Sequence, residues 1–330
     1  MWLEDFRFDG LRWDATSFIR NIYGGGHGPD DIPDGWRLMQ EINRETDRRQ
    51  PWKLQIAEDL RGNDWITRDP SAGGAGFDAQ WDADFVHPVR AGLTAASDGG
   101  RSMEELRRAI LRRYNEDAFR RVVYTESHDE VANGKARLPE EIWPGNAGSW
   151  FSRKRSILGA ALVFSAPGIP MIFQGQEILE DAWFHDQDPI DWSKEERYAG
   201  VLALYRDLIR LRRNWQDTTR GLSGQHVNVH HVNDEDNVLA FHRWAAGGPR
   251  DDVVVVLNVA NRPYERYRIG FPRGGSWKVR LNSDWAGYGA DFADHPSRDA
   301  LASDPPADGM PHGGDVRIGP YTVLFMSQDE

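Results

Sequence analysis

The first 216 residues alternate between short apolar segments and longer amphipathic ones, and this alternation limits the possible folds more than any other feature. The first short segment runs to Trp13 and ends in polar residues. Amphipathic segments such as 35–49 and 103–114 have the apolar spacing of helices. Strands that alternate with helices pair in parallel, and their functional side chains gather at the carboxyl ends of the strands. The pattern therefore predicts a parallel α/β barrel with its site at that edge.

Two of the predicted strands end in an acidic residue. Arg12 and Asp14 lie on the same face of the first strand, because residues two apart point the same way. An aspartate beside an arginine stays ionised and is able to act as a nucleophile, although a surface salt bridge is the alternative interpretation. Glu58 lies at the carboxyl end of the second predicted strand, 52–59, on the face of Leu54 and Ile56. The alternatives for Glu58 are a helix cap or a surface acid.

A third polar cluster follows the predicted strand 122–124. It contains His128 and Asp129, a pair that metal ions use as ligands. No second histidine-rich segment completes such a site in the pattern, so we predict no metal. A hydrogen-bonding histidine beside a charge-stabilising aspartate is the functional interpretation, and a polar turn is the alternative.

The spacing of apolar residues changes after about residue 216. Alternating segments and one continuous apolar run replace the helical pattern, at 226–232, 238–244, 253–257, 277–281 and 321–326. Period-two alternation is typical of half-buried strands. We therefore predict two domains, a barrel portion at 1–216 and an antiparallel β-sandwich at 217–330. Residues 298–314, rich in Asp, Pro and Gly, are expected to form a loop.

Composition excludes several classes of partner. The net charge of −12 argues against nucleic acid and against an anionic membrane surface. The chain has no cysteine and hence no disulfide, which fits a cytoplasmic location, and its start does not resemble a signal peptide. Fourteen tryptophans are compatible both with stacking on sugars and with ordinary core packing.

Three of these segments resemble, in the same order, the short motifs of the α-amylase family of glycoside hydrolases. They are residues 8–15 (FDGLRWDA), 56–59 (IAED) and 127–130 (SHDE), and the turn 173–177 (FQGQE) follows them. Within that family the sequence resembles 1,4-α-glucan branching enzymes. This resemblance rests on residues 21–25 (NIYGG), on IAED, and on SHDEV followed by Gly134 and Lys135.

The resemblance assigns a role to each polar strand end. Asp14 would be the nucleophile, Glu58 the general acid and base, and Asp129 the group that stabilises the transition state. Arg12 would keep Asp14 ionised, and His128 would donate a hydrogen bond to the sugar. Retaining glycosidases hold their two carboxyl groups about 5–5.5 Å apart and separate their pKa values. Neighbouring parallel strands, about 4.8 Å apart, are suited to that separation.

The implied reaction is cleavage of an α-1,4 link and transfer of the glucan to a 6-hydroxyl group, with no cofactor. The substrate would be an α-1,4-glucan such as glycogen, amylose or a maltooligosaccharide. Two alternatives are an α-amylase-type hydrolase and an inactive remnant that only binds carbohydrate.

The same resemblance implies that part of the barrel lies outside this sequence. In the α-amylase family the motif at residues 8–15 follows the fourth barrel strand, yet only 13 residues precede Asp14. Three βα units need far more chain. We therefore expect strands 4–8 of a (β/α)8 TIM barrel, from a truncated gene product or from half of a split enzyme with a partner chain. An open barrel leaves unpaired sheet edges, so we expect self-association and little activity of the chain alone.

Overall fold

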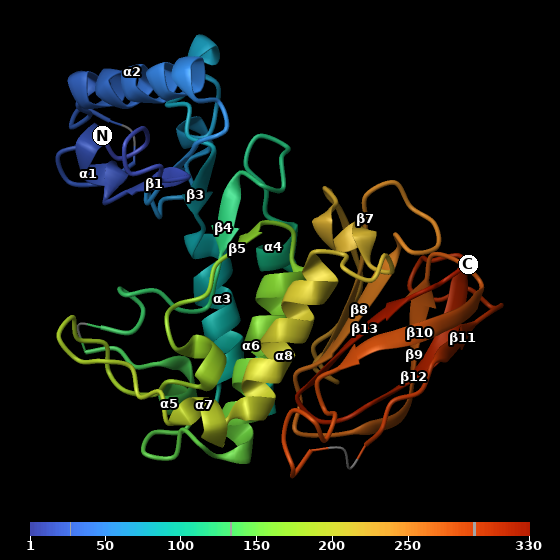
Figure 1. Cartoon of the computed structure of the whole chain (residues 1–330). Helices are drawn as coiled ribbons and strands as arrows, with labels where there is room; N and C mark the ends of the chain where they lie inside the picture. Colours follow the sequence, from blue (N-terminus) through green and yellow to red (C-terminus); the bar gives the residue numbers. More distant parts are fainter. Residues whose placement is uncertain (27, 133, 293–294) are drawn as a thin grey trace. The chain divides into compact units, whose positions relative to one another are not determined.

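The structure is a computed structural model that describes residues 1–26, 28–132, 134–292 and 295–330 (Figure 1). The chain divides into two compact units, described separately below. The first unit comprises Met1–Asp84 and Arg112–Val123, and the second comprises Phe85–Leu111 and Tyr124–Glu330. The domain boundary expected at residue 216 falls inside the second unit and stays a prediction.

The first unit is built on a parallel sheet. Its strands are β1 (Gly10–Trp13), β2 (Leu54–Ala57), β3 (Ala79–Trp81) and β4 (Arg121–Val123), which pair in that order. Two helices follow β1 along the chain, α1 (Thr16–Arg20) and α2 (Pro33–Arg49). The parallel pairing confirms the α/β class predicted for this part of the sequence.

An apolar cluster packs the sheet of the first unit against α2 and the loops that follow β2. Its buried members come from α2, β2 and the segment before β3, and they are Met39, Ala57, Ile66, Ala75 and Phe77. Trp13, Ile19 and Trp36 pack against this cluster. The cluster fixes β1 and β2 side by side, and the two polar strand ends are placed by that pairing.

Helices dominate the first half of the second unit. They are α3 (Ala83–Thr94, which begins in the first unit), α4 (Met103–Leu111), α5 (Leu138–Ile142), α6 (Trp150–Ser165), α7 (Lys194–Arg197) and α8 (Ala199–Arg212), and a short strand, β5 (Ile169–Pro170), follows α6. The helix α4 agrees with the predicted helical segment 103–114, whereas α3 was not predicted. Among the described residues, no helix has the length and apolarity that crossing a membrane requires.

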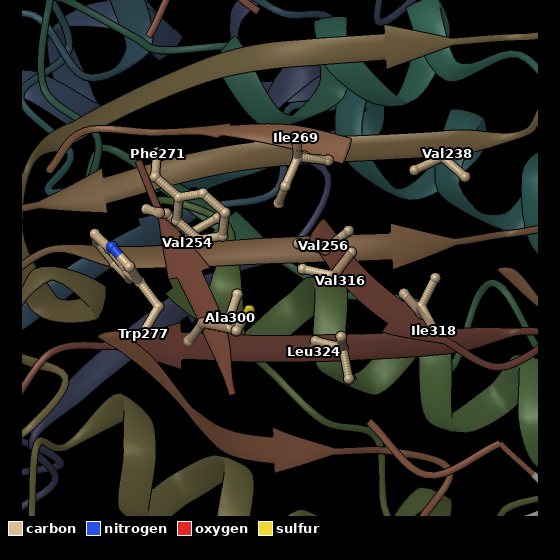
Figure 2. Packing of buried hydrophobic residues seen from close by; sticks show 13 residues of the cluster. Val238, Val254, Val256, Ile269, Phe271, Trp277, Ala300, Val316, Ile318 and Leu324 are labelled. Atoms are coloured by element: carbon tan, nitrogen blue, oxygen red, sulfur yellow. The ribbon is translucent and has the colours of Figure 1, made fainter. Parts of the chain in front are cut away.

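The second half of the second unit is antiparallel. One sheet has the order β11-β10-β13-β8-β7-β6, and a second consists of β9 and β12. The strands are β6 (His226–Asn233), β7 (Val238–Trp244), β8 (Val253–Asn258), β9 (Tyr264–Phe271), β10 (Gly275–Asn282), β11 (Ala300–Ala302), β12 (His312–Ile318) and β13 (Thr322–Ser327). Figure 2 shows side chains of β8, β9, β12 and β13 meeting between the sheets. The predicted sandwich is confirmed.

One expectation about the sandwich was wrong. Residues 298–314 were expected as a loop, but they contain β11 and the beginning of β12. The second and third residues of β12 are Gly313 and Gly314, which interrupt the alternation of apolar and polar residues that marks a strand. A side chain at Gly314 would come within 2.8 Å of the Phe271 ring on β9, so the glycine leaves room for that ring.

A buried ion pair joins α6 to the sandwich within the second unit. The Lys154 ammonium lies 2.6 Å from a carboxylate oxygen of Asp284 and donates to the Thr322 hydroxyl at 3.0 Å. Both side chains of the pair are almost fully buried. Burial lowers the pKa of Lys154 to about 8. The pair therefore fixes the helix on the sheet at the cost of desolvating a cation.

Replacing Lys154 by methionine should destabilise the second unit by about 3–5 kcal/mol, because Asp284 is then buried without its partner. Calorimetric unfolding measures the change. Lys278→Met is the matched control, since Lys278 pairs with Asp329 at the exposed surface and should matter much less. Equal effects of the two substitutions would contradict this role of the pair.

The same lysine predicts a dependence of stability on pH. Its pKa is about 8 in the folded chain and near the ordinary 10.5 in the unfolded one. Between these values the unfolded chain binds more protons, so the stability of the folded state rises with pH in that window. Urea unfolding at about pH 7.5 and about pH 9.5 should show this gain in the parent and not in Lys154→Met. Parallel pH profiles would refute the assignment.

Candidate active site

The register of β1 and β2 places two acidic residues at one sheet edge. Trp13 pairs with Ala57, so Asp14 and Glu58 are the next residues of the two strands. Backbone bonds continue the pairing beyond the strands: the Glu58 N–H donates to the Trp13 carbonyl at 3.0 Å, and the Thr16 N–H donates to the Glu58 carbonyl at 2.9 Å. Both acids therefore lie at the carboxyl ends of neighbouring parallel strands, as predicted.

One guanidinium group contacts both carboxylates. Arg12 Nη1 donates to Asp14 Oδ1, and Arg12 Nη2 lies 2.8 Å from Glu58 Oε2. The guanidinium carbon also lies 4.5 Å from the centroid of the Trp81 ring. The sequence predicted the contact of Arg12 with Asp14 but not the one with Glu58. The arginine thus holds the two acids together rather than serving one of them.

The two acids differ strongly in exposure. The Asp14 side chain is 78% exposed, whereas that of Glu58 is 9% exposed. A carboxylate that attacks a bound substrate must be reachable, and a general acid benefits from a dry environment. The difference in burial agrees with the roles expected for Asp14 and Glu58 and tests neither of them.

A strained residue directs the backbone toward Glu58. Ala15 follows Asp14 and has a φ of 45°, in the left-handed region that alanine rarely adopts. In this conformation its N–H donates to Glu58 Oε2 at 2.7 Å. Leu60, two residues after Glu58, has a φ of 57°. Strain of this kind gathers at functional sites, where the surrounding structure maintains it.

A second ion pair, missed in the sequence, supports the same edge. Arg20 on α1 donates to Asp59 from two nitrogens, at 2.7 and 2.9 Å, and both side chains are buried. Arg20 also donates to the Gly25 carbonyl at 2.9 Å. No local pattern in the sequence marks this pair, because Arg20 and Asp59 are 39 positions apart.

His128 and Asp129 belong to the second unit. Their side chains contact each other, with 3.3 Å between His128 Nε2 and Asp129 Oδ2, and both are about two-fifths exposed. The segment before them is firmly held: Glu126 is buried, accepts from the Leu138 N–H at 2.6 Å and pairs with Arg137 at 3.1 Å. The structure therefore brings Arg12, Asp14 and Glu58 together in one unit and presents the predicted His–Asp pair in the other.

Within the described ranges, no group of three or more His, Asp or Glu side chains is arranged to hold a metal ion.

Known proteins are similar to this chain over nearly its whole length. Residues 229–329 match the family model described as the alpha amylase C-terminal all-beta domain. The 1,4-alpha-glucan branching enzyme GlgB of Thermobifida fusca is 30% identical, with 99% of this chain and 44% of the relative covered. The GlgB of Cupriavidus necator is 29% identical, with the same coverage. The chain thus spans less than half the length of these relatives.

Solved structures share the fold at lower identity. A pullulanase from an Anoxybacillus species, solved with maltotetraose, has a TM-score of 0.66 and 19% identity over 99% of this chain and 45% of its own. The alpha-amylase from H. orenii has a TM-score of 0.62 and 17% identity over 99% of this chain and 62% of its own. Both likenesses concern the arrangement of the backbone.

Replacing Asp59 by asparagine should destabilise the first unit by about 3–5 kcal/mol, because it leaves the Arg20 cation buried without a countercharge. Chemical unfolding followed by tryptophan fluorescence measures the loss. The control is Glu45→Gln, which breaks exposed ion pairs with Arg48 and Arg49 and should change little. If Asp59→Asn is as stable as the control, the pair does not support this edge.

Proposed function

We propose that this chain, which belongs to the α-amylase family, supplies Asp14, Glu58 and Asp129 to the active site of a retaining enzyme that acts on α-1,4-glucans, and that its reaction is branching. The observation that carries the proposal is the shared guanidinium of Arg12, which joins an exposed and a buried carboxylate at neighbouring strand ends. The similarity to two GlgB branching enzymes over 99% of the chain supports branching as the reaction.

The proposed reaction has two steps. In the first, Asp14 attacks the anomeric carbon, the α-1,4 bond breaks, and Glu58 gives its proton to the leaving oxygen. In the second, Glu58 takes the proton of a 6-hydroxyl group on an acceptor glucan, and that oxygen displaces Asp14 from the sugar. The products are a shortened donor chain and a new α-1,6 branch. Water in place of the acceptor would give hydrolysis.

The supporting groups have separate tasks in this proposal. Arg12 orients both carboxylates, and the Ala15 N–H donates to Glu58 Oε2, the oxygen that Arg12 also contacts. Asp129 and His128 bind hydroxyl groups of the sugar that is attacked. None of these tasks requires a metal ion or a cofactor.

Replacing Asp14 by asparagine should lower the rate of glucan turnover by about a thousandfold or more, because the amide cannot attack the anomeric carbon. Asp9→Asn is the matched control: Asp9 lies just before the same strand and its side chain is fully exposed. The assay measures turnover of amylose by the chain alone. It then measures turnover by the chain mixed with the part of the Thermobifida fusca relative that the chain does not match.

Two readouts separate the possible reactions. Branching lowers the iodine colour of amylose with few new reducing ends, whereas hydrolysis lowers the colour and releases reducing ends in proportion. Turnover by Asp14→Asn at the rate of Asp9→Asn would contradict the mechanism. Proportional release of reducing ends would replace branching by hydrolysis.

A further inference from the structure

A pocket of about 400 Å³ lies in the first unit, outside the cluster of Arg12, Asp14 and Glu58. Its walls come from the segment before α2, from the first turns of α2 and from the loop after β2. Ile32, Pro33, Trp36, Trp65 and Gly73 give it a mainly apolar surface. This volume falls in the range of pockets that hold small ligands.

Two tryptophans form flat walls of the pocket, and the structure fixes both. The Trp36 indole N–H donates to the Gly73 carbonyl at 3.1 Å, so the polar atom of this ring is satisfied and its apolar surface remains for a ligand. Trp65 is 39% exposed. The Arg68 guanidinium lies 4.3 Å from its ring centroid and is not part of the pocket lining, so it holds the ring from outside.

The loop that carries Trp65 is tightly closed. The Ala75 N–H donates to the Trp65 carbonyl at 2.8 Å. A Cβ atom at Gly74 would lie only 2.0 Å from the Arg68 carbonyl oxygen, so this close approach requires glycine. The wall is therefore formed before a ligand arrives, which lowers the entropic cost of binding.

The polar groups of the pocket carry both signs of charge. Asp31 is held by the Asn21 amide at 3.0 Å, and Arg20 is held by Asp59. Arg37 lies exposed at the rim and pairs with Asp34. An anionic ligand would be repelled by Asp31, and a cationic ligand would be repelled by Arg20 and Arg37. A neutral polyhydroxylated ligand suits such a pocket, because hydroxyl groups both donate and accept hydrogen bonds and pyranose rings present apolar faces to indoles.

We infer that this pocket binds glucose residues of an α-1,4-glucan, at a site separate from the reacting bond. The inference rests on the proposed function for the choice of sugar. Arg20 connects the two places, since it lines the pocket and pairs with Asp59, the neighbour of Glu58. A glucan held by Trp36 and Trp65 is thereby anchored next to the acid–base residue.

The test measures binding of maltohexaose to the chain in an Asp14→Asn background, which prevents turnover. Because the chain has no cysteine, a fluorophore on Asp34→Cys in the first turn of α2 reports occupancy beside the pocket. The same fluorophore on Asp217→Cys, an exposed position in the second unit, is the reference.

Trp65→Ala should lower the affinity for maltohexaose, as reported by the Asp34→Cys label, by at least about tenfold. Trp65→Phe should recover most of that affinity, because stacking needs an aromatic ring. Trp52→Ala removes an exposed tryptophan that does not line the pocket and should change nothing. Unfolding curves confirm that each variant is folded.

The outcomes separate this inference from the proposed function. No response of the Asp34→Cys label to maltohexaose, or equal affinity in Trp65→Ala and the parent, overturns the pocket assignment even if the chain turns over amylose. Binding that depends on Trp65, together with no turnover by the parent chain complemented as in the turnover assay, supports the pocket and counts against the proposed reaction.

Discussion

The arrangement of the candidate site depends on one ion pair network, in which Arg12 contacts Asp14 and Glu58 at the end of the β1–β2 pair. The parallel register sets it up, because Trp13 and Ala57 are partners and the acids come next. Two carboxylates at one edge would repel each other without a cation between them. The guanidinium removes that repulsion and fixes the orientation of both groups, with its flat face against Trp81.

A second layer keeps this arrangement in place. Asp59 and Arg20 form a buried pair directly behind Glu58, and the positive φ of Ala15 turns its N–H to the same carboxylate. Breaking a buried pair of this type is costly, because it leaves an uncompensated charge in the interior. The same Arg20 lines the tryptophan pocket, so one cation joins the neighbour of Glu58, the proposed acid–base residue, to a surface suited to sugar rings.

The sequence predicted the features that depend on local periodicity and order. Alternation of strands and helices led to the parallel sheet, and period-two segments led to the sandwich. It did not predict α3, because Pro88 inside this helix normally ends one. It also missed β12, where Gly313 and Gly314 interrupt the alternation that marks a strand.

Side-chain partners across long sequence separations were the least predictable part of the site. The contact of Arg12 with Glu58 joins residues 46 positions apart, and the pair of Arg20 with Asp59 joins residues 39 positions apart. Single-sequence patterns carry no information on such pairs. The sequence also did not predict the pocket of Trp36 and Trp65. The chain has many tryptophans, and each of them is equally compatible with core packing.

The most direct measurement of the central claim is the identification of the residue that becomes glycosylated. A Glu58→Gln chain, complemented as in the turnover assay, is treated with maltosyl fluoride, whose leaving group needs no proton. The intermediate then accumulates because its breakdown lacks the base. Acid quenching and peptide mass spectrometry should locate one maltosyl ester on Asp14. An ester on another residue, or reaction of the Asp14→Asn chain at the same rate, would contradict the account.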